Sequence, residues 1–387
     1  MECLGDLVLV SRDKSRRQES SKQLTKVYIL CEYCSVRQGM FHSESRELRV
    51  HDEDCYICQG LMNQLDSIVG NIITAIDRRY EFGTFLIGAT LPTEIYERED
   101  ELRAKFKIHG VENIKNQLTR ILRLKFAKLT TTELDYLLPD LVVNLLIQNK
   151  YEIKININSR ALLLAGRYTK KCRGIVQKQT KCHECKGKGC NSCDNSGLSG
   201  YDSIEGIIAK YLMAITKGES PRFTWVGSED RQSLVLGKGR PFFVSISNPK
   251  NRKFKEIVKV DNPCISASVT DKFTQVTIGC ALKFVTKTRI LVSSSQSLSP
   301  KEYNNLKTLN GVNVSFHSKS RVAIKKIYSA YMDECASNEF YLTIIADGGL
   351  AIKQFVEGRE YMKPTVSELL STNCECILFD VLDVWLR

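Results

Sequence analysis

Apolar residues follow helical and strand spacings in turn along the first half of the chain. Residues 59–79, QGLMNQLDSIVGNIITAIDRR, repeat apolar positions on one helix face, and residues 94–106, EIYEREDELRAKF, predict a charged helix. Between them, residues 81–91, EFGTFLIGATL, predict a strand. Residues 134–147 predict a short helix and a strand, and residues 151–168 predict alternating strands. The first half therefore reads as an α+β module.

The pattern changes after residue 200. Residues 201–218, YDSIEGIIAKYLMAITKG, predict an amphipathic helix, and residues 236–249, LGKGRPFFVSISNP, end with strand alternation. Beyond residue 255 the predicted strands are EIVKV, TQVTIGCAL, RILVSS, VNVSF, RVAIKKIYSAYM, FYLTIIA and CILFDVLDV. Two helices are expected among them, at SPKEYNNLKTL and TVSELLS. We expect a second α+β domain with an extensive antiparallel sheet.

The length of the chain indicates the number of domains, and its charge indicates the class of partner. A chain of 387 residues is too long for one ordinary core, so two or three domains are expected. The 56 Lys and Arg exceed the 44 Asp and Glu, and a net charge of +12 favours a polyanionic partner such as nucleic acid. No apolar run is long enough to cross a bilayer, and residues 1–20 carry no export signal. We expect a cytoplasmic protein with no membrane contact and no obligate protein partner.

Cysteine is unusually frequent, with 15 residues. Because the cytosol keeps thiols reduced, metal binding is a better first hypothesis than a disulfide framework. Seven cysteines are scattered or lie in apolar stretches, where a buried hydrophobic role is expected. These seven are Cys3, Cys172, Cys264, Cys280, Cys335, Cys374 and Cys376. The other eight form four CxxC pairs.

The first two pairs predict a structural zinc site. CEYC holds Cys31 and Cys34, CYIC holds Cys55 and Cys58, and twenty residues separate the pairs. This is the spacing of a zinc ribbon, in which four thiolates close a tetrahedron and leave no position open for chemistry. A redox CxxC, the alternative, would normally come as a single pair.

The other two pairs lie close together in CHECKGKGCNSC. Cys182 and Cys185 are separated by four residues from Cys190 and Cys193, and the loop is rich in glycine. A compact knuckle of this kind can wrap one zinc ion. The pattern also resembles half of the zinc module of the Hsp40 chaperones, but the second half and the J domain are missing.

Several unusual motifs occur in one order along the chain. From about residue 28 to residue 384 they read CEYCSVRQ, CYICQGL, YEFGTFLIGATLP, EIYEREDELRAKF, PDLVV, GRYTKKCRGIVQKQTKC, CKGKGCNSC, GSEDxxxxxLGKGRPF and IKQFVEG. Together these motifs resemble the tRNA pseudouridine synthases of the Pus ten type in archaea and eukaryotes. The resemblance implies an N-terminal zinc-bearing, THUMP-containing domain that holds tRNA. It also implies a C-terminal pseudouridine-synthase domain with a large mixed or antiparallel sheet.

On this basis the chain divides into four parts. We expect a zinc-ribbon segment at 1–60, a THUMP-like α+β RNA-binding domain at 61–175, a cysteine-rich zinc knuckle at 176–200 and the catalytic domain at 201–387. The implied activity is isomerisation of uridine to pseudouridine in the TΨC arm of tRNA, at position 55 and, in archaeal members, also 54. Structural zinc is expected, and no organic cofactor.

The resemblance also assigns site residues. The family motif reads approximately G-R-E-D-x-D-x-R-x-L-G-x-G-R-P-F, and its catalytic aspartate falls on Asp230. A late strand motif places Lys353 as the cation that pairs with this aspartate, and Arg240 is a further catalytic candidate. The expected substrate-binding residues are Gly237, Gly239, Phe242, Arg321, Arg167 and Thr288.

The chain departs from the family pattern at several positions. Ser228 stands where the family has an arginine, and Thr288, or Arg289 in an alignment shifted by one residue, stands where it has a stacking tyrosine. The other departures are Gln232, Leu234 and Ala351.

A second hypothesis is therefore a catalytically weak or inactive tRNA-binding protein, or an RNA chaperone. An ion pair of Lys353 with Asp230 in a cleft that admits a uridine favours the enzyme. A zinc deaminase is set aside, because no HxE and CxxC pair has the arrangement that a deaminase site requires.

Overall fold

The computed structural model describes most of the chain and divides it into two compact units, Met1–Arg160 and Ala161–Arg387. Each unit is described by itself below. The described residues are 24, 27–40, 55–76, 79–108, 112–148, 152–253, 258–272, 282–318, 321–335, 338–358 and 361–387.

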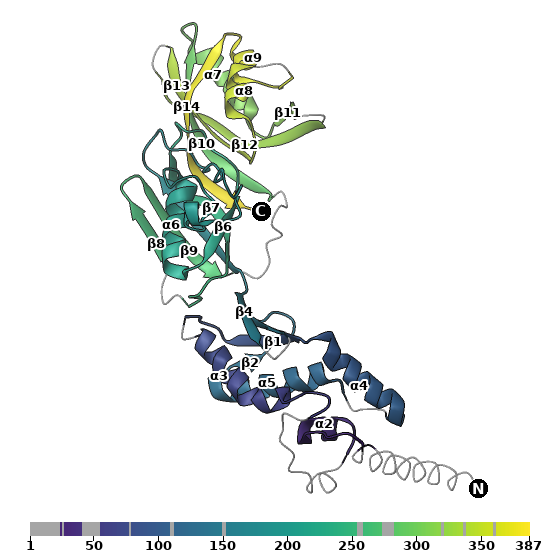
Figure 1. Ribbon diagram of the computed structural model, residues 1–387. Helices are drawn as coiled ribbons and strands as arrows, with labels where there is room; N and C mark the ends of the chain where they lie inside the picture. Colours follow the sequence, from purple (N-terminus) through teal and green to yellow (C-terminus); the bar gives the residue numbers. More distant parts are fainter. Residues whose placement is uncertain are drawn as a thin grey trace, which may run out of the picture. The chain divides into compact units, whose positions relative to one another are not determined.

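The first unit is a four-stranded sheet with the strand order β2-β1-β3-β4 and helices packed on it (Figure 1). β1 is parallel to β2 and β3, and β4 is antiparallel to β3. The strands are β1 (Thr84–Thr90), β2 (Glu133–Leu134), β3 (Leu141–Ile147) and β4 (Ile153–Ser159). The helices are α2 (Glu32–Arg37), η2 (Leu61–Gln64), α3 (Leu65–Ile76), α4 (Thr93–Phe106) and α5 (Ile114–Thr130).

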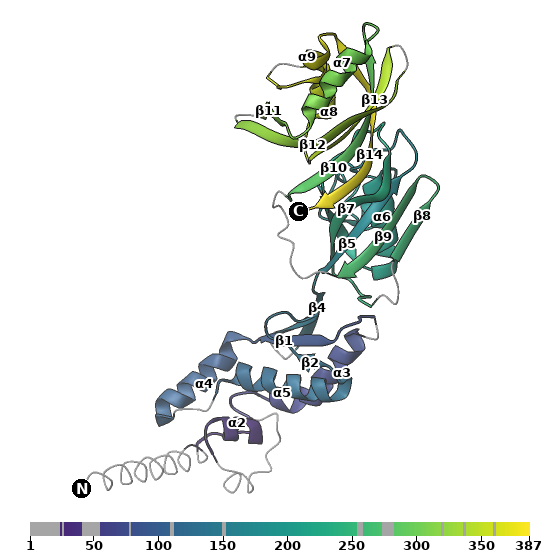
Figure 2. The same cartoon turned by 180° about the vertical axis from the view of Figure 1, so that it is seen from behind.

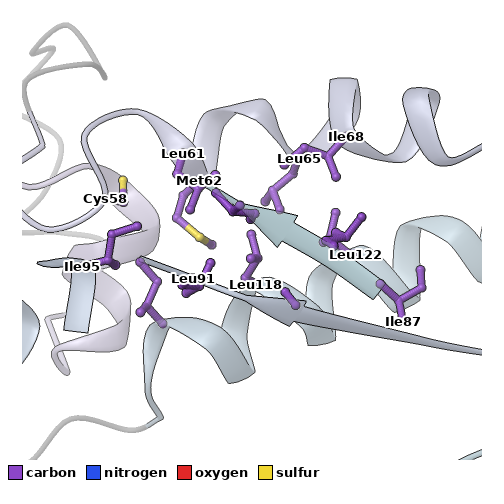
Figure 3. Packing of buried hydrophobic residues seen from close by; sticks show 14 of the residues in the cluster. Cys58, Leu61, Met62, Leu65, Ile68, Ile87, Leu91, Ile95, Leu118 and Leu122 are labelled. Atoms are coloured by element: carbon purple, nitrogen blue, oxygen red, sulfur yellow. The ribbon is translucent and has the colours of Figure 1, made fainter. Parts of the chain in front are cut away.

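The core of this unit forms where α3 and α5 cover one face of the sheet (Figure 3). Alternate residues of β1 are buried, as expected for a strand with one covered face. Leu118 and Leu122 of α5 lie one helical turn apart and point into the same cluster as Leu65 of α3 and Ile87 of β1. Cys58 lies at one end of this cluster, so the first cysteine group is continuous with the core.

The second unit is built on one ten-stranded sheet. Nine strands follow the order β11-β12-β13-β10-β14-β7-β5-β9-β8, and β6 pairs with β7. Only one residue pair, Val381 with Val235, joins β14 to β7, and this junction is parallel. The strands are β5 (Leu162–Lys170), β6 (Glu219–Trp225), β7 (Val235–Ser247), β8 (Val258–Asn262), β9 (Ile265–Lys272), β10 (Phe284–Ser294), β11 (Asn313–Ser318), β12 (Arg321–Cys335), β13 (Glu339–Asp347) and β14 (Cys374–Leu386).

Two hydrophobic clusters lie on this sheet, one mainly among β10 to β14 and the other mainly among β5, β7, β8 and β9. Figures 1 and 2 show α6 on one part of the sheet and α7, α8 and α9 on the other. α6 (Ile204–Thr216) packs on β5, β7 and β9. α7 (Pro300–Asn305), η5 (Leu306–Leu309), α8 (Ile352–Glu357) and α9 (Val366–Leu370) pack on β10, β13 and β14. No helix among the described residues has both the length and the apolar character that a bilayer crossing needs.

Most predicted elements are confirmed, including the helices in 59–79, 94–106 and 201–218. The short helix expected within 134–147 is wrong. Asp135 accepts hydrogen bonds from the N–H groups of Leu137 (2.8 Å) and Leu138 (3.0 Å), which closes a turn instead. α5 was not predicted, and the predicted strand TQVTIGCAL lies almost wholly outside the described residues.

The division between the units also differs from the expected boundary at residue 175. β5 pairs with β7 and β9, so the second unit begins at Ala161 and includes both β5 and the cysteine-rich knuckle. β5 belongs to the second unit because every other side chain along it is buried, and Leu162 and Leu164 lie in the core beneath α6.

One cysteine expectation is wrong. Cys172 and Cys264 form a disulfide, with Cα atoms 5.0 Å apart, rather than acting as separate buried thiols. Pairing of Lys170 with Ile265 brings the end of β5 next to the start of β9, and therefore brings these two cysteines together. Cys374 and Cys376 are buried free thiols, as expected. Cys3 and Cys280 lie outside the described residues, as does the side chain of Cys335.

Candidate active site and metal centres

The structure brings Asp230 and Lys353 together, although 123 positions separate them in the sequence. Asp230 lies in the loop between β6 and β7, and Lys353 lies in the first turn of α8. Lys353 Nζ is 2.8 Å from Asp230 Oδ2, and the N–H of Gln232 donates to Asp230 Oδ1 at 2.9 Å. Lys353 was expected in a strand, but a turn at Gly348 and Gly349 ends β13 and the chain then enters a helix.

The pair keeps both groups charged. The ammonium of Lys353, and after it the N–H of Gln232, lowers the pKa of Asp230 below its ordinary value. In return the Asp230 carboxylate raises the pKa of Lys353. The two side chains remain partly exposed, at 30% for Asp230 and 51% for Lys353, so a substrate can reach them.

A cavity of about 610 Å³ opens beside this pair. Its volume lies within the range of pockets that hold small ligands. Ser228, Asp230 and Lys353 form part of its polar lining, and Phe284, Phe379 and Val381 form part of its apolar lining. The cavity therefore combines an ion pair with apolar surfaces, which suits a flat polar ring such as a nucleobase.

Two phenylalanines supply aromatic surface in the cavity. Thr288 lies on β10 in the cavity wall, but it is only 3% exposed and has no ring to stack. Phe284 at the start of β10 and Phe379 on β14 are half-buried and line the same cavity. Neither residue was predicted from the sequence, because which side chains of β10 and β14 face the cavity depends on the register of the two strands.

The glycines of GKGRPF do not line the cavity. Gly237 has φ +58°, and a methyl group there would lie 2.2 Å from the carbonyl oxygen of Leu382. Gly239 has φ +75°, and a methyl group there would lie 2.5 Å from the carbonyl oxygen of Tyr168. Each glycine lets β7 pass close to a neighbouring strand, which is a structural need rather than a contact with substrate.

Three other expected residues turn inward. Arg240 is 2% exposed at the cavity floor, where its guanidinium donates to Glu229 (3.0 Å) and to the carbonyl of Val226 (2.7 Å). Phe242 is fully buried in the core beneath α6. Arg167 donates to the carbonyls of Gly239 (2.7 Å) and Val384 (3.0 Å). Arg321 begins β12, and its side chain lies outside what the structure describes.

The four cysteines of the first group are buried, and their sulfur atoms lie within 4.8 Å of one another. Sulfur atoms around a tetrahedral zinc ion, each about 2.3 Å from the metal, lie about 3.8 Å apart. Cys31 Sγ and Cys58 Sγ are 3.6 Å apart, close to that value. Arg37 donates to Cys34 Sγ at 3.2 Å and also contacts Glu99 of α4 and Gln117 of α5. The group therefore fits one metal ion and is tied to two helices of the unit.

The second group also fits one metal ion. The sulfur of Cys182 is 3.9 Å from that of Cys190, and the sulfur of Cys185 is 3.8 Å from that of Cys193. Main-chain N–H groups of Gly189 and Gly197 point at the sulfurs of Cys185 and Cys193, at 3.2 and 3.3 Å. Such contacts stabilise thiolates, the form that binds metal.

Comparisons with known proteins agree with this architecture. The model of the Pus10 C-terminal family matches residues 163–385, and the model of the archaeal Pus10 THUMP domain matches residues 68–145. A protein of Nitrosopumilus maritimus named tRNA pseudouridine synthase Pus10 is 34% identical over 94% of this chain and 97% of its own length. A protein of the same name from Cenarchaeum symbiosum is 30% identical over 91% of this chain and 89% of its own length.

Solved structures are far less similar. A Cbf5-Nop10-Gar1 complex aligns with 46% of this chain and 44% of its own, at 9% identity and a TM-score of 0.29, which is too low to support an argument. The two family models and the full-length relatives confirm the resemblance noted in the sequence. The chain belongs to the Pus10 family of tRNA pseudouridine synthases.

Proposed function

We propose that this protein isomerises uridine to pseudouridine in the TΨC arm of tRNA, at position 55 and also at position 54, with Asp230 as the catalytic aspartate. The observation that carries the proposal is the Asp230–Lys353 pair, 2.8 Å long, at the wall of a cavity of about 610 Å³. Side chains do not fill this cavity, which is the arrangement expected of an enzyme rather than of a retired site.

The reaction explains why one carboxylate is enough. Pseudouridine formation breaks the N-glycosidic bond, turns the uracil and joins it to the ribose through carbon 5. It therefore needs one nucleophile or base placed against the ribose and uracil. Lys353 keeps Asp230 ionised, which either role requires. Phe284 and Phe379 offer the uracil ring an apolar surface that Thr288 does not provide.

The target uridine lies inside a folded loop and must leave its stack, which costs a few kcal/mol. Ser228 lines the cavity where the family has an arginine, and it is too short to occupy the space that the nucleotide vacates. The grip on the RNA must then come from elsewhere. We assign it to the THUMP domain and to the basic surface implied by the charge of +12.

We further propose that each cysteine group holds a structural zinc ion. The ligands would be Cys31, Cys34, Cys55 and Cys58 in the first site, and Cys182, Cys185, Cys190 and Cys193 in the second. Four thiolates complete the coordination of zinc, so these ions would hold the fold and take no part in the isomerisation.

The test is carbodiimide-based primer extension on an unmodified tRNA transcript. Wild-type protein should produce stops at positions 54 and 55, and Asp230→Asn, which removes only the charge, should produce none. Asp100→Asn, an exposed aspartate on α4 of the first unit, is the matched control and should retain the stops.

Two results would count against the proposal. Stops that persist in Asp230→Asn would remove Asp230 from the catalytic role. Absence of stops with wild-type protein that still binds the transcript would favour the alternative function, a tRNA-binding protein or RNA chaperone.

A further inference from the structure

Two oppositely charged side chains lie fully buried beneath the loop that carries Asp230. Lys170, at the end of β5, and Glu229 are both 0% exposed, and Lys170 Nζ is 3.8 Å from Glu229 Oε1. Lysine and glutamate are almost never fully buried unless they are paired, because removing a charge from water is costly. This burial therefore needs an explanation that the catalytic chemistry alone does not provide.

The ammonium of Lys170 donates its hydrogen bonds to main-chain carbonyls. Its ammonium donates to the carbonyls of Ile175 (3.1 Å), Asp230 (3.3 Å) and Arg231 (3.2 Å). An ammonium has three N–H donors, so these three carbonyls use all of them. One side chain thus ties the segment after β5 to the backbone of the catalytic residue.

Glu229 is held from the other side. Its Oε2 accepts from Arg240 Nε at 3.0 Å and from the hydroxyl of Tyr168 at 2.7 Å. Gln177 donates to the Tyr168 hydroxyl (2.9 Å) and to the carbonyl of Gly227 (3.3 Å). The side chain before Asp230 is therefore anchored in the core, while the Asp230 carboxylate reaches the cavity and Lys353.

The charges beneath the loop do not cancel. Lys170 and Arg240 carry two positive charges against the single negative charge of Glu229. The Asp230 carboxylate pairs with Lys353, whose hydrogen bond does most to lower the pKa of Asp230, and the charge of Lys170 lowers that pKa further. The same buried group can thus fix where the carboxylate lies and favour its ionised form.

We propose that Lys170 and Glu229 are positioning residues, which hold the loop 226–233 so that the Asp230 carboxylate faces the cavity and Lys353. The inference rests on the proposed function of Asp230. Neither residue acts on the substrate directly: Lys170 works through the backbone of residues 230 and 231, and Glu229 works through its anchor on Arg240 and Tyr168.

Lys170→Met in the full-length protein is the direct test. It leaves the Arg240–Glu229 pair in place and removes the contacts of the ammonium with the three carbonyls and with Glu229, and we expect a folded protein. At saturating tRNA its kcat should fall by about tenfold to a hundredfold with KM unchanged, because misplacing a catalytic group affects the chemical step. The acid limb of its pH profile should also move to higher pH. Lys171→Met, at the exposed neighbouring position, should keep the wild-type kcat.

Tyr168→Phe is the milder variant, because it removes a single hydroxyl from Glu229 and keeps the buried ring. It should lower kcat several-fold without changing KM. A folded Lys170→Met protein with a kcat within twofold of wild type overturns the role of Lys170. If Lys170→Met does not fold, an unchanged kcat in Tyr168→Phe overturns the proposal.

Hydrogen exchange separates this inference from the proposed function. The amides of Gln232 and Ser233, which bond to the Asp230 carboxylate and carbonyl, should exchange faster in Lys170→Met than in wild type. This readout needs no catalytic activity. Wild-type protein without activity would contradict the proposed function. Equal amide exchange at Gln232 and Ser233 in wild type and Lys170→Met would contradict the positioning role of Lys170.

Discussion

Gly237 offers the sharpest structural prediction, through the variant Gly237→Ala. The new methyl group would lie 2.2 Å from the carbonyl oxygen of Leu382, and the backbone has φ +58°, which alanine adopts at a cost. The left-handed conformation costs about 1–2 kcal/mol and the overpacking about 1–3 kcal/mol. We therefore expect a loss of roughly 2–5 kcal/mol in the free energy of unfolding of the second unit.

Gly311→Ala is the matched control. Gly311 has φ +78°, but a methyl group there would have no atom within 4 Å, so only the conformational cost of about 1–2 kcal/mol applies. Both substitutions also reduce the entropy of the unfolded chain by the same amount, and this effect cancels in the comparison.

Urea unfolding followed by tryptophan fluorescence measures the difference. The chain has two tryptophans, Trp225 on β6 and Trp385 on β14, and both lie in the second unit. The signal therefore reports on that unit alone. Equal unfolding free energies for Gly237→Ala and Gly311→Ala would refute the reasoning, because they would mean that β7 does not pass close to β14 at Leu382.

Two other variants test the charge pair and the metal centres. Lys353→Met removes the cation that does most to lower the pKa of Asp230, so the acid limb of the kcat/KM profile should move to higher pH in the variant. Overlapping acid limbs in the wild-type and variant profiles would contradict this. The double variant Cys55→Ser/Cys58→Ser should lower the zinc content measured by mass spectrometry from two ions to one and reduce helix content, while leaving the tryptophan-reported unfolding unchanged. Zinc content equal to wild type would exclude the first site.

The family resemblance was enough to predict the pairing of Asp230 with Lys353, because one family motif assigns the aspartate and another assigns its cationic partner. Phe284 and Phe379 could not be predicted in this way. Which side chains of β10 and β14 face the cavity depends on the register of the two strands, and that register shifts between Lys287 and Thr288. Such a bulge depends on packing across the sheet and leaves no local signal in the sequence.

The direction in which a side chain points could not be predicted from the sequence either. The motif GKGRPF predicted a functional turn, but its Phe242 entered the core and its Arg240 turned to a buried carboxylate. The role of Gly237 depends on a carbonyl 145 residues further along the chain. Lys170 lies in the motif GRYTKKCRGIVQKQTKC, but the motif did not indicate its role, and only the fold places its ammonium next to the backbone of Asp230.

Every residue that lines the cavity lies between positions 227 and 381, inside the second unit. The proposed active site and the THUMP domain thus occupy separate parts of the chain, and each part can change under its own selection. A recombination that replaced the coding sequence upstream of Ala161 would join the same cavity to a different N-terminal unit. Related proteins can then differ in the RNA that they select while they keep the same reaction.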